Sequence, residues 1–93
     1  MMRKTDFAPI LADDAPSADT LTDYDKEHLI IYRGLLDAER NGAEWDEASL
    51  LVLGIDPIRE PARARRAWES HLARAKWLAE HRYGRLLGEG ARY

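Results

Sequence analysis

The sequence of 93 residues contains no cysteine, which excludes disulfides and cysteine-based zinc or redox sites. A reducing compartment is the simplest interpretation of that absence. No stretch approaches the roughly 20 apolar residues needed to span a bilayer. The opening segment, Met1–Phe7, lacks the apolar run of a signal peptide. We therefore expect a cytoplasmic protein that has no membrane partner.

The sequence also lacks the arrangements that catalysis, metal binding or phosphate binding requires. Ser17, Ser49 and Ser70 stand in no strained, glycine-flanked turn. His71 follows Ser70 directly, and helix neighbours point about 100° apart, so we expect no cooperation between them. No two histidines have the i, i+4 spacing of a helical zinc pair, and no glycine-rich phosphate loop is present. We predict no enzyme activity, no cofactor, no metal and no small-molecule ligand.

Charge is distributed unevenly along this single-domain chain. Residues 1–56 hold five Lys or Arg against thirteen Asp or Glu, whereas residues 57–93 hold nine against four. Such an asymmetry can mark an interaction face or tail. Alternatively, the two halves neutralise each other in the folded protein.

The two ends of the chain are poor in large apolar residues. We predict a flexible acidic tail over residues 1–20, a folded domain over 21–88 and a flexible tail over 89–93. Phe7, Ile10 and Leu11 are an apolar exception, and they could fold onto a partner or dock on their own domain.

Hydrophobic periodicity predicts an all-α fold with three main helices and a C-terminal helical turn containing Leu86 and Leu87. The first helix spans 22–41, capped by Thr22 or Asp23 and stopped at Asn41-Gly42. The second spans 45–53 and ends at Gly54, and the third begins at Pro61 and continues to about residue 82. We expect one core containing Leu36, Leu50, Leu53, Trp68, Leu72 and Ala75, with Leu51 also facing inward.

The third predicted helix has an apolar face and a basic face. His71 lies on the apolar face, where we expect a hydrogen-bonded core residue. The opposite face carries Arg63, Arg66, Ser70, Arg74 and Trp77. Tryptophan is enriched at interface hot spots, although Leu86-Leu87 or the N-terminal tail could equally fold over this indole.

The second helix, the turn and the basic third helix follow the order of the helix-turn-helix of DNA readers. Arg63, Arg66 and Arg74 could contact phosphates and guanines. The net charge of −3 and the acidic N-terminal half count against DNA, because affinity for DNA depends largely on phosphate neutralisation.

Several blocks of the sequence resemble a known family. They are Asp-Pro-Ile-Arg-Glu-Pro-Ala-Arg-Ala-Arg-Arg-Ala (56–67), Ser-His-Leu-Ala-Arg-Ala-Lys-Trp-Leu (70–78), Glu-His-Arg-Tyr-Gly-Arg-Leu-Leu (80–87), Tyr-Asp-Lys-Glu-His-Leu-Ile-Ile-Tyr (24–32) and Leu-Leu-Asp-Ala (35–38). They are similar to the RovC-type DNA-binding domain of proteobacteria, over about residues 21–87.

The resemblance implies a helix-turn-helix variant with one of two roles. Members fused to another domain activate element-transfer genes by binding DNA. Stand-alone members are antiactivators that bind transcriptional activators, including a LuxR-type quorum-sensing regulator, and repress excision and transfer of integrative and conjugative elements. The acids Glu60, Glu69 and Glu80 within the basic helix favour an antiactivator, with a DNA-binding regulator as the alternative. We expect a monomer that binds protein activators through Trp77, Arg66, Arg74, Arg63 and Ser70, or through Phe7, Ile10 and Leu11.

Overall fold

The computed structural model describes residues 11–88, which form helices and no strand. This confirms the predicted all-α fold. The elements are α1 (Asp23–Glu27), α2 (Leu29–Arg40), α3 (Trp45–Ala48), the π-helical turn η2 (Ser49–Leu53), α4 (Pro61–Glu80) and the 3₁₀ turn η3 (Gly84–Leu87). The predictions for residues 1–10, including Phe7 and Ile10, and for residues 89–93 lie outside the described part.

The first helical region is divided in two, where the sequence predicted one helix over 22–41. Thr22 caps α1 through a reciprocal capping box with Asp25. At His28 the backbone leaves the helical conformation, with φ −118° and ψ 20°. The cause is competition for the Tyr24 carbonyl oxygen, which would accept the His28 amide in a continuous α-helix. The His28 ring Nδ1 donates to this oxygen at 2.6 Å, and the His28 amide donates instead to the Asp25 carbonyl oxygen. Gly42, at φ +80°, follows α2, as predicted.

The second helix differs from its prediction in the direction of its leucines. After α3 the backbone widens into η2, and Leu50 and Leu51 are 52% and 73% exposed, where we predicted both inside. A π turn holds more residues per turn than an α-helix. Val52 and Leu53, the last two residues of this turn, are partly buried and pack against the main core. Gly54, at φ +72°, ends the element as predicted.

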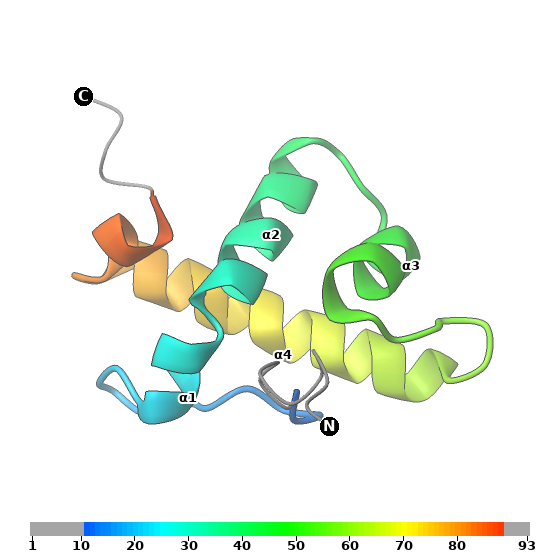
Figure 1. Ribbon diagram of the computed structural model, residues 1–93, viewed down its shortest axis with the longest axis horizontal. Helices are drawn as coiled ribbons and strands as arrows, with labels where there is room; N and C mark the ends of the chain where they lie inside the picture. The colour runs from blue at the N-terminus through cyan, green and yellow to red at the C-terminus, as the bar shows by residue number, and fades with distance from the viewer. Residues whose placement is uncertain (1–10, 89–93) are drawn as a thin grey trace, which may run out of the picture.

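Helix α4 organises the rest of the fold. It runs the length of the molecule, with α2 and α3 on one side and α1 on the other in the view of Figure 1. α3–η2, the turn and α4 follow in the predicted helix-turn-helix order. The main core lies between α2, α3–η2, α4 and η3, and its buried members are Tyr32, Leu35, Leu36, Ala48, Leu72, Ala75, Leu78 and Leu87. Trp68 and Leu53 pack against this core while only partly buried.

Candidate functional site on helix α4

The described N-terminal segment, residues 11–20, lies against α4, in the region where the sequence predicted a flexible tail. Leu11 packs on a second small core formed by Ile55, Ala64 and Ala67. Further along, the Ala15 amide donates to Ser70 Oγ at 3.1 Å. These contacts, together with the ion pairs below, offset the cost of ordering a segment that is poor in large apolar residues. The segment therefore covers part of the face that we had predicted to be exposed.

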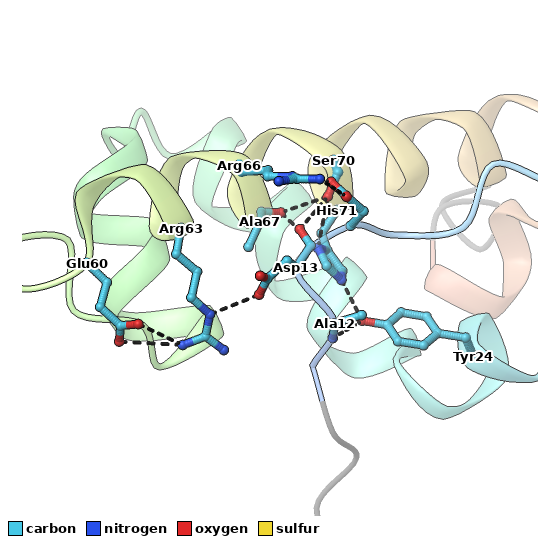
Figure 2. Close-up of polar contacts among 10 residues, drawn as sticks. Ala12, Asp13, Tyr24, Glu60, Arg63, Arg66, Ala67, Ser70 and His71 are labelled. Carbon is cyan, nitrogen blue, oxygen red and sulfur yellow. Dashed lines mark hydrogen bonds and ion pairs between the residues drawn. The ribbon is translucent and has the colours of Figure 1, made fainter.

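Two arginines of α4 bind the adjacent acids Asp13 and Asp14 of this segment, and Figure 2 shows the contacts of Arg63. Arg63 Nε donates to Asp13 Oδ1 at 2.9 Å, and Arg63 also reaches Glu60 at 3.2 Å. Arg66 binds both carboxylate oxygens of Asp14, and its hydrogen bonds lower the pKa of that carboxyl. All these side chains are half exposed, so each pair contributes little to stability. Their effect is that the guanidinium groups of Arg63 and Arg66 are bound by carboxylates of the same chain.

Arg74 corrects the sequence prediction most clearly. We placed it on the exposed side of the helix, yet only 4% of its side chain is accessible. Its Nη2 and Nε donate to the two oxygens of Asp25, at 2.7 and 3.1 Å. Its Nη1 and Nη2 also donate to the backbone carbonyls of Ala18 and Thr20. A buried guanidinium is tolerated here because each of its three nitrogens donates to an acceptor.

Asp25 is equally well satisfied, and it is fully buried. One oxygen accepts from Tyr32 Oη at 2.7 Å, and the other accepts from the amide and hydroxyl of Thr22. Burial on its own would raise the pKa of Asp25, but the hydrogen bonds from Arg74, Thr22 and Tyr32 outweigh it. They lower the pKa from 3.8 to about 2, so the carboxylate is charged at neutral pH.

The lowered pKa of Asp25 predicts a specific loss of stability in acid. A carboxyl whose pKa is depressed in the folded state stabilises fully above its unfolded pKa, here 3.8, and less as the pH falls towards about 2. The contribution is about 2 kcal/mol. We expect the free energy of unfolding, measured by urea titration between about pH 5 and pH 2, to fall by this amount or more. Tyr32→Phe removes one hydrogen-bond donor to Asp25 and should shift the loss of stability to higher pH. A free energy of unfolding that stays constant over this pH range would contradict the lowered pKa of Asp25.

A hydrogen-bonded chain joins the N-terminal segment to the middle of α4 (Figure 2). The Ala12 amide donates to Tyr24 Oη at 3.0 Å, and that oxygen lies 2.6 Å from His71 Nε2. His71 Nδ1 lies 2.8 Å from the Ala67 carbonyl oxygen, which can only accept, so Nδ1 carries the proton and Nε2 accepts from Tyr24. His71 is fully buried, and burial lowers its pKa. It is the hydrogen-bonded core histidine that we expected.

Ser70 approaches the same ring more closely than the sequence suggested. Its Oγ lies 3.3 Å from His71 Nδ1. That nitrogen directs its proton to the Ala67 carbonyl and so has no lone pair for the serine hydroxyl. Ser70 Oγ instead accepts from the Ala15 amide and lies near the carbonyls of Asp13 and Ala67. This serine therefore positions the N-terminal segment.

Trp77 lies beside a cleft that the N-terminal segment forms with α4. The cleft has a volume of about 310 Å³ and a largely apolar lining of Ala15, Pro16, Ser17, Ser70, Ala73, Arg74 and Trp77. The indole is partly buried, stacks on His81 and carries the Arg74 guanidinium 4.6 Å from its ring centre. The N-terminal segment therefore lies beside this indole, which still lines a cleft, and the hot-spot alternative stays a prediction.

The two oppositely charged halves of the chain meet on α4. Four of its cations pair with acids of the first half, namely Arg63 with Asp13, Arg66 with Asp14, Arg74 with Asp25 and Lys76 with Glu39. Three of these pairs join residues about 50 positions apart, and Lys76 and Glu39 are also distant in the sequence, so no local spacing could have revealed them. We gave two interpretations of the uneven charge distribution, and these four pairs follow the one in which the two halves of the chain neutralise each other.

Comparison with known proteins adds no assignment, because neither a family model nor a curated protein matches this chain. Within residues 11–88, no three acidic or histidine side chains are grouped as metal ligands would be. Over the same residues, no helix combines the length and apolar character needed to cross a membrane.

Proposed function

We propose that this protein is an antiactivator, which binds transcriptional activators and represses excision and transfer of a conjugative element. Its targets would be a LuxR-type quorum-sensing regulator and an activator that carries a related domain. The observation that supports this most is the occupation of Arg63, Arg66 and Arg74 by carboxylates of the same chain. A helix that reads DNA needs cations available to phosphates and bases.

The cleft beside Trp77 is the proposed contact with the activator. It offers the large aromatic ring of Trp77 and the polar groups of Ser70 and Arg74 on α4, and the N-terminal segment supplies the opposite wall. Hot spots commonly combine a tryptophan with an arginine in a pocket from which water is excluded. Arg74 would act from beneath the ring, because its guanidinium is committed to Asp25. Arg63 and Arg66 lie further along the same face of α4.

The test of this contact is the Trp77→Ala variant. We expect its affinity for the LuxR-type activator to fall by about 2 kcal/mol, or roughly 30-fold in Kd. Surface-immobilised activator and a kinetic binding assay measure this directly, after circular dichroism has shown that the variant folds. Ile30→Ala, which truncates an exposed apolar residue of α2, is the matched control and should bind like the natural protein. Equal binding by both variants would remove the cleft from the proposal.

DNA binding is the second candidate, since Arg63 and Arg66 make half-exposed pairs that phosphates could replace. A titration with promoter fragments at physiological salt distinguishes the two functions. We expect no sequence-selective binding by the natural protein. Asp13→Asn combined with Asp14→Asn removes the carboxylates that the N-terminal segment places on Arg63 and Arg66, and it shows whether the acidic segment is what prevents binding. A selective Kd of about 10⁻⁸ M or tighter for the natural protein would favour the regulator instead.

A further inference from the structure

The outer side of the short α3–η2 helix is a second surface, separate from the Trp77 cleft. Its two central leucines, Leu50 and Leu51, are exposed because the π turn directs them away from the core. Single exposed apolar residues are ordinary, but two adjacent leucines beside an irregular turn form a patch that stability does not explain. π turns inside helices are frequent at functional sites.

Acidic side chains precede this patch on the same short helix. Asp46 and Glu47 precede Leu50 and Leu51 by one helical turn, Glu44 stands just before the helix, and all three acids are exposed. No lysine or arginine occurs between Asn41 and Ile58, a stretch with four acids. Within residues 11–88, these three carboxylates make no ion pair, in contrast to the paired acids Asp13, Asp14 and Asp25. Their charge is therefore available to a partner.

This combination of charge and apolar surface selects the kind of partner. A nucleic acid is disfavoured, because its phosphates would meet carboxylates where the first helix of a helix-turn-helix normally crosses the DNA backbone. A second copy of this chain packing on the same face is disfavoured too, since a symmetric contact would bring the acids of both copies together. The complementary surface is one that carries lysines and arginines around apolar side chains.

We propose that the α3–η2 face, Asp46, Glu47, Leu50 and Leu51, binds the basic DNA-contacting surface of the target activator. This rests on the proposed antiactivator function and gives it a mechanism. Any activator that binds DNA must present cations to phosphates. Carboxylates of this face would pair with those cations while Leu50 and Leu51 cover neighbouring apolar groups. The activator could then not hold DNA and this protein at the same time.

Two double variants test the face against matched controls. Asp46→Asn with Glu47→Gln removes the charge, and Leu50→Ser with Leu51→Ser removes the apolar patch. We expect each to weaken activator binding at least ten-fold, and the first to flatten its salt dependence as well. The controls, Glu80→Gln and Ile30→Ser, change an exposed acid and an exposed apolar residue on other helices and should leave Kd unchanged. Thermal unfolding of every variant verifies the fold.

The outcomes separate this inference from the proposed function. If the natural protein binds the activator and both double variants bind equally well, the face is wrong while the antiactivator function stands. If the natural protein does not bind the activator at all, the proposed function fails and the inference fails with it. A DNA competition completes the test, because an excess of the activator's binding site should displace this protein. A stable complex of all three would overturn the mechanism.

Discussion

Replacing Arg74 by alanine is expected to lower the free energy of unfolding by about 3–5 kcal/mol, the largest effect among the α4 arginines. The substitution leaves the carboxylate of Asp25 buried and without its cation, with only Thr22 and Tyr32 as donors. It also frees the carbonyls of Ala18 and Thr20, which hold the N-terminal segment in place. Chemical unfolding followed by circular dichroism measures the change.

Arg63→Ala provides the matched comparison for this prediction. It removes an arginine from the same helix, but one that forms a half-exposed pair with Asp13, and its unfolding midpoint should stay close to that of the natural protein. If Arg74→Ala were as stable as Arg63→Ala, the buried Arg74–Asp25 pair would not stabilise the fold as its geometry indicates. A variant too unstable to fold at room temperature agrees with the expected magnitude, because domains of this size have only modest stability.

Leu78→Ala is expected to destabilise the protein by about 2–5 kcal/mol. Leu78 is fully buried in the core between α2, α4 and η3. Truncating it removes apolar contacts and leaves a cavity that the surrounding helices can fill only in part. The unfolding free energy from urea titration gives the value.

The control for the core prediction is Leu51→Ala, the same chemical change at a residue that is 73% exposed. Because little apolar surface is removed from a buried environment, we expect a change below about 0.5 kcal/mol. Our sequence-based expectation placed Leu51 inside, and that expectation would have predicted similar losses for both variants. Comparable destabilisation by Leu51→Ala would therefore support the original prediction that Leu51 faces the core.

The sequence by itself determined the helical class and most helix limits of the described protein. Thr22 caps the first helix, Gly42 and Gly54 follow the next two, and Pro61 begins α4, as expected. It also indicated that His71 lies on the buried face of that helix. Each of these features depends on interactions within a few residues, such as capping bonds, left-handed glycines and helical periodicity. Such interactions can be inferred from the order of residues alone.

Only the tertiary structure decided which sides of the helices are free. Periodicity gives the direction of Arg74 around the α4 axis, but it does not say that Asp25 and the N-terminal segment stand opposite. A charged residue can be buried there because partners about 50 positions away satisfy its donors. In η2, likewise, one widened turn directs Leu50 and Leu51 outward. These outcomes depend on contacts between distant segments and on local departures from α-helical geometry, neither of which a regular sequence pattern encodes.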